Sequence, residues 1–225
     1  MKVGKQIQGT YKMANYKISD ETKNSVIKAA GTLYAKYGTN AVSVKDIAAL
    51  AKVRASAINY HFGGKGKLIK AVMDYARSNW NWKKLLNYYN ENQHLLKTGD
   101  GKKQLVSDLI DIFYKMLYND GEPLWSHVLL ARITLSDIGN RKILNEDVAQ
   151  PILKTFENVY LKITDNKDIN SARCWAIHIA GGIAILITNT VILTESESDV
   201  DANYSFFRRF QHSTTENALF EAGLK

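Results

Sequence analysis

The feature that most constrains this chain is a pair of short amphipathic helical patterns in SVKDIAALAKVRASAINYHF, residues 43–62, separated by about three residues. Ser43 is the expected N-cap of a helix that begins at Val44, because a serine hydroxyl accepts a hydrogen bond from the unpaired amides of a first turn. So short a connection leaves room only for two helices packed against each other. The pattern therefore predicts a helix-turn-helix.

The same patterns predict which faces are buried. Ile47, Ala48 and Ala51 form a small apolar face on the first helix, and Ile58 and Phe62 point inward from the second. The residues of the second helix expected to face solvent are Arg54, Ser56, Asn59 and His61. Small alanines let two helices cross closely, so the second helix can protrude into a groove.

Positive charge is concentrated in the same part of the chain. The whole chain has 30 Lys and Arg against 22 Asp and Glu, a formal charge of +8. Residues 1–75 hold 13 basic and 4 acidic side chains, a charge of +9, whereas the remaining 150 residues hold 17 and 18, a charge of −1. Lysine and arginine displace counterions from phosphates. The charge distribution alone fits a lysine-rich surface equally well, but together with the helix pair it favours a nucleic-acid partner.

Helical periodicity extends through most of the chain. There are only two prolines, Pro123 and Pro151, and no alternating strand pattern bounded by hairpin turns. We therefore predict an all-α protein of nine or ten helices, with an N-terminal three-helix helix-turn-helix domain and a larger helical domain. Pro151 predicts a kink or break near Gln150.

Three segments are expected along the chain. Residues 1–18 are predicted to be a flexible basic arm, residues 19–66 the helix-turn-helix domain, and residues 67–225 a helical body, with a long helix from about Lys67 to Trp80 at its start. The first helix should begin near Asp20, end at Gly38 and bury one stripe. That stripe consists of Val26, Ala30, Leu33, Tyr34 and Tyr37.

Cysteine usage and the N-terminus predict the compartment. Cys174 is the single cysteine, so no internal disulfide forms, and MKVGKQIQGTYKMANYK lacks the apolar core of a signal peptide. Ile177 to Leu193 is apolar but at the lower limit for a membrane span, and it contains His178 and Asn189. We expect a buried helix there and a cytoplasmic protein.

The sequence carries no recognisable catalytic motif. The segment GGKGK, residues 63–67, lacks the spacing of a phosphate-binding loop, and neither G-x-S-x-G nor H-E-x-x-H occurs. Cys174 and His178 lie four residues apart, but one cysteine and scattered histidines favour buried packing over a metal site. We predict no enzyme activity, no cofactor and no metal.

Several motifs together carry a family resemblance. A first helix ends in Tyr37-Gly38, SVKDIAALAKV follows, and the next segment ends in NYHF before Lys65-x-x-Leu68. In this combination the chain resembles the TetR family of one-component transcriptional regulators. The NYHF ending and the stretch PLWSHVLLARITLSD are similar to one branch of it. The resemblance implies a DNA-binding N-terminal domain and an effector-binding, dimerising body.

The resemblance implies DNA contacts at the positions that match. Lys45 corresponds to a position that contacts the backbone or a base edge, and Lys65 to a lysine that contacts phosphate. Asn59 could pair with an adenine edge or bind a phosphate. The implied DNA-binding residues are Lys45, Arg54, Ala55, Ser56, Asn59, Tyr60, His61 and Lys65.

The chain departs from the family pattern at several positions. Lys52 stands where a turn glycine is usual, so a non-glycine residue is expected in the left-handed conformation. Arg54 replaces the usual serine cap and leaves the second helix without a hydroxyl acceptor. Gly66 replaces a frequent glutamate, and Ala57 removes one hydroxyl contact.

Aromatic residues in the body indicate a candidate ligand pocket. Trp125, Leu129 and Arg132 share one helical face, and an arginine on an apolar stripe could receive an anionic or polar effector. The alternative is an arginine paired with Asp137 or another carboxylate at a helix seam. The candidate pocket residues are Tyr89, Phe113, Trp125, Leu129, Arg132 and Trp175.

The apolar helix near the C-terminus is also a candidate dimer interface. In the resembled family the last two helices form a four-helix bundle in a symmetric dimer, which lets two recognition helices read two half-sites. The candidate interface residues are His178, Gly182, Ile183, Leu186, Thr190, Phe206 and Phe210. The alternative is an ordinary monomer core.

These observations predict a dimeric, ligand-responsive transcriptional regulator. We expect a repressor that a small-molecule effector releases from a palindromic double-stranded DNA operator. Two alternatives stay open. One is a small-molecule-binding helical protein or enzyme whose basic N-terminus is incidental, and the other is an architectural DNA binder that responds to no ligand.

Overall fold

The computed structural model describes residues 3–78, 80–118, 124–136, 146, 149–193 and 200–225; for residues 3–18, 118, 134–136, 185–193 and 200–204 it describes the backbone alone. Within these ranges every regular element is a helix, which confirms the all-α prediction. The chain divides into two compact units, Met1–Ala76 and Arg77–Lys225.

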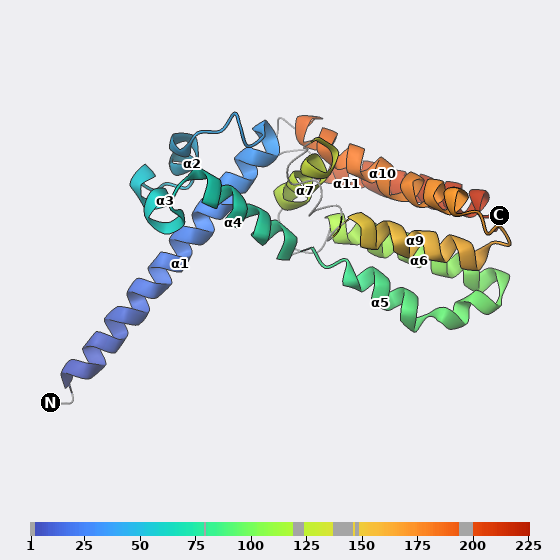
Figure 1. Ribbon diagram of the computed structural model, residues 1–225, viewed down its shortest axis with the longest axis horizontal. Coiled ribbons are helices and arrows are strands. Elements are labelled where there is room, and N and C mark those ends of the chain that lie inside the picture. Colours follow the sequence, from blue (N-terminus) through green and yellow to red (C-terminus); the bar gives the residue numbers. More distant parts are fainter. Residues whose placement is uncertain (1–2, 79, 119–123, 137–145, 147–148, 194–199) are drawn as a thin grey trace. The chain divides into compact units, whose positions relative to one another are not determined.

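The first unit contains the helix-turn-helix. Its helices are α1 (Val3–Tyr37), α2 (Val44–Leu50), α3 (Ala55–Phe62) and the greater part of α4 (Lys65–Ser78). In Figure 1, α2, α3 and α4 gather around the C-terminal half of the long helix α1. Helix α2 begins at Val44, as the sequence predicts, and four residues separate its end from the start of α3, close to the predicted three.

Helix α1 differs from the prediction at its start. The sequence predicts a flexible arm over residues 1–18 and a helix from about Asp20, but the helix begins at Val3. The physical reason is that no proline interrupts this stretch, and its lysine, glutamine, methionine and alanine residues are good helix formers. The predicted end is confirmed, because Gly38 follows Tyr37 with φ +79 and its amide donates to the Tyr34 carbonyl at 2.9 Å.

The core of the first unit follows the predicted stripes except at Tyr37, which is exposed, and at Leu33 and Phe62, which are half-buried. Ile47, Ala48, Ala51 and Ile58 are buried as predicted, together with members of the α1 stripe. Tyr37 was expected inside but is 55 % exposed, because it lies in the last turn of α1; the Lys36 ammonium lies 5.4 Å from its ring centroid. The buried members contributed by α1 and α4 are Val26, Ala30, Tyr34, Leu68, Val72 and Ala76.

The second unit is a bundle of longer helices (Figure 1). Its elements are the short helix α5 (Lys83–Glu91), the 3₁₀ helix η1 (Gln93–Lys97), α6 (Gly99–Tyr118), α7 (Leu124–Ser136), α9 (Gln150–Ile163), α10 (Ile169–Leu193) and α11 (Val200–Glu221). Helix α10 packs against α7, α9 and α11, and α6 packs against α5 and α11. The helix predicted from about Lys67 to Trp80 corresponds to α4, which ends at Ser78, and α5 follows it as a separate helix.

An aromatic cluster forms the centre of the second unit. Trp175 on α10 is 1 % exposed, and its indole N–H donates to the Ala218 carbonyl on α11 at 2.9 Å. The rings of Phe156 and Tyr160 on α9 lie 6.1 and 5.6 Å from the Trp175 ring. Burial of large aromatic side chains with their polar atoms satisfied is the main source of stability for such a core.

Pro151 lies at the start of a helix and not inside one. Helix α9 begins at Gln150 and holds Pro151 in its first turn, so the predicted break near Gln150 is the start of a helix. The sequence also predicts a turn over residues 136–140 and a helix over about 141–163, of which residues 137–145 and 147–148 lie outside the described residues. In the part of the chain that the structure describes, no helix has the length and apolarity needed to cross a membrane.

Candidate nucleic-acid interface

Helix α2 is fixed at its start by a reciprocal cap. The Asp46 amide donates to Ser43 Oγ at 3.2 Å, while the Ser43 amide donates to Asp46 Oδ2 at 2.9 Å. Each side chain thus satisfies a backbone amide that the first turn leaves unpaired. The hydrogen bonds from the Ser43 hydroxyl and amide lower the pKa of the Asp46 carboxyl below its usual value. This cap sets the direction in which α2 presents Lys45.

The turn between α2 and α3 has the predicted left-handed residue. Lys52 has φ 55, the conformation in which a side chain is strained and a glycine is not. The Val53 amide donates to the Ala48 carbonyl at 3.0 Å, which closes the end of α2. The turn therefore keeps the geometry of a helix-turn-helix although its usual glycine is missing.

Helix α3 is held by few contacts of its own. Arg54 occupies the N-cap position and makes no side-chain cap, as predicted, and the left-handed Gly63 ends the helix with its amide donating to the Asn59 carbonyl at 2.8 Å. Ile58 is the one residue of α3 that is fully buried, and Phe62, expected inward, is only half-buried. The remaining side chains of α3 are left outside the core.

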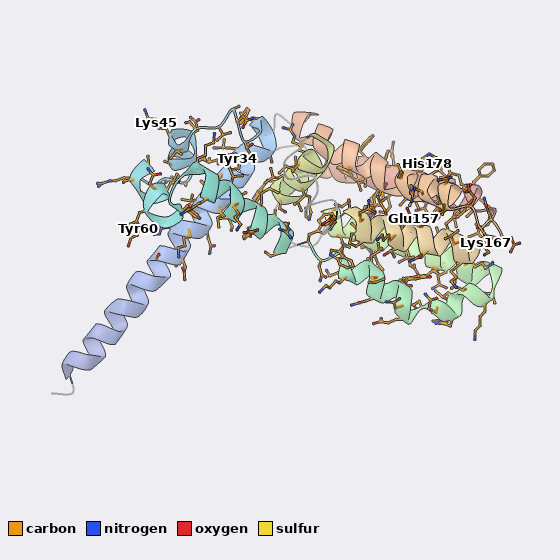
Figure 2. All side chains as sticks on the ribbon, in the orientation of Figure 1. Tyr34, Lys45, Tyr60, Glu157, Lys167 and His178 are labelled. Carbon is orange, nitrogen blue, oxygen red and sulfur yellow. The ribbon has the colours of Figure 1, made fainter. Side chains whose placement is uncertain are left out.

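The eight predicted DNA-binding residues come together around α3. They lie in the first turn of α2, from the N-cap to the last turn of α3, and at the first residue of α4. Six are exposed, and His61 and Lys65 are half-buried. Tyr60 is 85 % exposed and meets the His61 ring edge-on with centroids 5.0 Å apart. Figure 2 labels Lys45 on α2 and Tyr60 on α3.

This surface combines the groups that nucleic-acid recognition uses. Lys45, Arg54 and Lys65 carry cations, which bind phosphates, and the Asn59 amide offers the donor and acceptor pair that matches an adenine edge. The hydroxyls of Ser56 and Tyr60 can bind either phosphate or base. The charged and hydrogen-bonding groups of this surface are suited to binding.

A cavity of about 230 Å³ lies within the second unit. Its lining comes mainly from α6, α7, α9 and α10, together with Trp80, which follows α4. The principal lining side chains are Trp80, Phe113, Leu117, His127, Ile152 and Ile183. Of these residues only Phe113 was predicted from the sequence to line a pocket. An aromatic residue just after α4, Trp80, is the sequence feature that could have indicated the site.

The other five predicted pocket residues do not line this cavity. Trp175 belongs to the aromatic core described above, and Tyr89 and Leu129 are also buried. Trp125 and Arg132 are half-buried. Asp137, the partner considered for the arginine, lies outside the described residues. The cavity is therefore bounded by a different set of side chains from the one that a single helical stripe indicates.

The predicted dimer residues fall into three groups. His178 is exposed, with Nδ1 3.0 Å from Glu221 Oε1, and Phe206 is 52 % exposed. Gly182 meets Phe210 within the chain, because a Cβ there would lie 3.0 Å from Phe210 Cζ, and Ile183 is buried. The side chains of Leu186 and Thr190 lie outside those that the structure describes.

The prediction that Cys174 and His178 are packed in the interior is wrong. Both are exposed on α10. The reason is that the contacts of α10 within the second unit lie on its opposite side, which carries Trp175, Ala176 and Ile179. The 174–178 face of α10 is therefore a surface of the single chain.

Comparison with known proteins identifies the helix-turn-helix unit. The family model for bacterial regulatory proteins of the tetR family matches residues 26–72, which cover the C-terminal part of α1 through α3 and into α4. The transcriptional repressor Rv3405c of Mycobacterium tuberculosis is 39 % identical over 56 residues, which are 25 % of this chain and 30 % of that protein. The regulator TtgR of Pseudomonas putida is 38 % identical over 56 residues, 25 % of this chain and 27 % of that protein.

Solved structures extend the likeness to the whole fold. The TetR-family regulator SCO4454 of Streptomyces coelicolor has a TM-score of 0.50 at 16 % identity, over 88 % of this chain and 96 % of that one. The hemolysin II regulator HlyIIR has a TM-score of 0.52 at 16 % identity, over 83 % and 97 %. At such identities the likeness concerns the fold alone, and the sequence matches span less than a third of the curated relatives.

The α2–α3 geometry and the matched segment define a protein of the helix-turn-helix class. Its relatives are named as transcriptional regulators and not as enzymes. Over residues 26–72 the chain is similar to the regulatory proteins of the tetR family.

Proposed function

We propose that this protein is a DNA-binding transcriptional repressor that acts as a homodimer and is released from its operator by a small molecule. The observation that carries the proposal is the exposed polar face of α3, flanked by Lys45 and Lys65, in the first third of the chain, which holds all of the excess positive charge. A repressor is favoured because the matched relative Rv3405c is named as one.

In this proposal α3 enters the major groove. Lys45 and Lys65, at the starts of the two helices on either side of α3, bind phosphates and fix the register, while Ser56 and Asn59 meet base edges. Arg54, at the N-terminus of α3, can contact either a phosphate or a base edge. The small buried face of α3, centred on Ile58, supports this role because it leaves the other side of the helix available.

The exposed apolar residues of the last two helices support a homodimer. Ile177 on α10 is 47 % exposed, and Phe206 and Phe220 on α11 are 52 % and 74 % exposed. Large apolar side chains on neighbouring helices are costly in water and mark an interaction surface. A second copy of the chain would cover them and would present two copies of α3 to a two-fold symmetric site.

The cavity and the chain path support a ligand response. The cavity of the second unit is lined by Trp80, and α4 ends only two residues earlier, at Ser78, having begun at Lys65 in the first unit. A ligand that binds one arrangement of the second unit better than another shifts the population toward it. In the dimer, the favoured arrangement would space the two α3 helices wrongly for the operator.

The DNA-binding part of the proposal is tested by removing the flanking cations. DNA is first selected from a random duplex library with the wild-type protein, and its affinity is then measured for the double variant Lys45→Ala, Lys65→Ala. Affinity should fall, and the slope of log affinity against log salt should decrease by about 2, because each lost phosphate contact removes about 0.9.

A matched control has the same change in charge on the other unit. Lys103 and Lys154 are exposed lysines of the second unit, so Lys103→Ala, Lys154→Ala should bind the selected DNA as wild type does. Circular dichroism confirms that both double variants fold. Equal DNA affinity of the two variants, with equal salt slopes, contradicts the proposal.

A further inference from the structure

The residues that line the cavity in the second unit restrict the charge of a ligand that can bind there. Among the described residues that line it, aliphatic and aromatic side chains predominate, and none is Asp, Glu, Lys or Arg. An ion transferred to such a place without a partner loses its hydration and gains little in return. Arg132, the cation that the sequence suggested for an anionic effector, does not line it.

One polar group in this lining is positioned to hold a ligand. The indole nitrogen of Trp80 is buried and has no hydrogen-bond partner among the described residues. An indole N–H is a donor only, and a buried donor without an acceptor carries its full desolvation penalty. His127 is the one other polar side chain among the described lining residues, and the neighbouring walls of Phe113, Leu117 and Ile183 are apolar, so a water molecule there would find few of the polar partners it needs.

The ring of Trp80 is itself held in place. It lies 5.2 Å from the His127 ring of α7 at an interplanar angle of 59°, so the indole is packed against a second aromatic ring. The Trp80 amide donates to the Arg77 carbonyl at 3.1 Å, which ties the residue to the end of α4. The donor therefore has a fixed direction, as a binding group requires.

We propose that the cavity binds a neutral, mainly apolar small molecule with one hydrogen-bond acceptor, which accepts from the Trp80 indole N–H. The inference rests on the proposed function in one respect, namely that this cavity is the effector site. An apolar cavity of about 150 Å³ holds benzene, so about 230 Å³ has room for a molecule of roughly ten non-hydrogen atoms or somewhat more, such as a bicyclic aromatic ketone.

This assignment also names the residue through which the ligand acts. Because Trp80 is attached to the end of α4, a ligand that binds its N–H restrains the segment that leads into the helix-turn-helix unit. The remaining lining residues contribute affinity, and Trp80 contributes both selectivity for an acceptor and the link to α4. Loss of the N–H should therefore weaken both the binding of a ligand that has an acceptor and the effect of that ligand on DNA binding.

The test uses three probes of the same size and shape. Methyl naphthyl ketone has an acceptor, isopropenylnaphthalene replaces the carbonyl oxygen by a methylene group, and naphthoate carries a charge. Binding to the full-length protein is measured by calorimetry for wild type, Trp80→Phe and the control Trp82→Phe, since Trp82 does not line the cavity. A further variant, Ala180→Leu, fills the cavity from α10 and leaves Trp80 unchanged.

The expected result is a wild-type preference for the ketone over the alkene of about threefold to tenfold, as one neutral hydrogen bond provides. Trp80→Phe should abolish this preference, Trp82→Phe should keep it, and Ala180→Leu should weaken both neutral probes. The inference is overturned if naphthoate binds most tightly, if neither neutral probe binds, if the preference survives in Trp80→Phe, or if Ala180→Leu binds both neutral probes as wild type does.

The same samples separate this inference from the proposed function. Affinity for the selected DNA is measured without any probe and then with the ketone. Absence of DNA binding without a probe contradicts the proposed function and leaves the ligand assignment to be decided by calorimetry alone. Ketone binding that follows the expected pattern but leaves DNA affinity unchanged supports the ligand class and contradicts the role of the cavity as effector site.

Discussion

The hydroxyl of Ser25 on α1 donates a hydrogen bond of 3.1 Å to the carbonyl oxygen of Ala51, the last residue before the turn of the helix-turn-helix. The two residues are 26 positions apart in sequence. This bond ties the C-terminal end of α2 to the long helix α1, next to the left-handed Lys52. The hydrogen bond from Ser25 thus holds the turn in place from α1. This external contact helps the turn to accommodate a non-glycine residue at position 52.

Replacing the strained residue of this turn should stabilise the protein. At φ 55 a lysine side chain crowds its own backbone, and Lys52→Gly removes that strain while adding the backbone entropy of glycine to the unfolded chain. We expect a net gain of about 0.5–1 kcal/mol in the free energy of unfolding, measured by urea denaturation. Lys28→Gly, in the middle of α1, should instead lose about 1 kcal/mol; a loss in both variants contradicts the strain at Lys52.

Removing the N-cap of α2 should destabilise the protein in a pH-dependent way. Ser43→Ala deletes the hydroxyl that accepts from the Asp46 amide, and such a change costs about 1 kcal/mol at neutral pH. The same hydroxyl lowers the pKa of Asp46, so its stabilising effect is present above the usual carboxyl pKa of 3.8 and is lost as the pH falls through the lower folded value.

Denaturation of wild type and Ser43→Ala at neutral pH and below pH 3.8 checks this. The difference between them should shrink in acid. Thr32→Ala is a suitable control, because the Thr32 hydroxyl only donates to the Lys28 carbonyl within α1 and caps nothing. A difference between Ser43→Ala and wild type that is the same at both pH values excludes the Asp46 carboxylate from the cap.

Two tyrosines should respond in opposite directions to loss of their hydroxyls. The Tyr34 hydroxyl is buried without a hydrogen-bond partner among the described residues, and burial raises its pKa to about 12. Tyr34→Phe removes an unsatisfied group and should stabilise the protein by roughly 1 kcal/mol. Tyr88→Phe loses a hydrogen bond of 2.6 Å to Asp108 and should destabilise it by a similar amount. Thermal or chemical denaturation distinguishes the signs, and destabilisation by Tyr34→Phe contradicts the unpaired hydroxyl.

Asn59 should determine a base in each half-site. Asn59→Ala removes the amide that matches an adenine edge, so it should relax the preference at one position of the selected DNA by about 1–3 kcal/mol. Affinity for DNA changed at that position should become similar to affinity for the original. The control Asn90→Ala changes an exposed asparagine of α5 and should leave the preference intact. An unchanged preference in Asn59→Ala removes Asn59 from base recognition.

The helix-turn-helix could be predicted from the sequence because its determinants are local. Ser43 caps α2, Ile47 and Ile58 mark the buried faces, and Lys52 takes the predicted left-handed conformation, all within residues 43–62. The start of α1 could not be predicted in the same way. No capping residue or proline marks it, so only the absence of a helix breaker argues for a start at Val3.

The cavity could not be predicted because several distant segments build it. Phe113, His127, Ile152 and Ile183 come from four helices, and the periodicity of one helix does not reveal which of its residues meets a gap between the others. The stripe that contains Leu129 and Arg132 was therefore a poor guide to the lining. Trp175 was also predicted to line the pocket, but its indole N–H donates to the Ala218 carbonyl and the residue belongs to the core.

The most direct test of the central claim is the sequence that the purified protein selects from random duplex DNA. Two copies of α3 in a symmetric dimer predict an inverted repeat, with half-site centres about 10 base pairs or a multiple of that apart. The full-length wild-type protein should enrich such a repeat, and Lys45→Ala, Lys65→Ala should enrich it weakly or not at all. Enrichment of no sequence, or of a single unrepeated site, contradicts a dimeric reader of DNA.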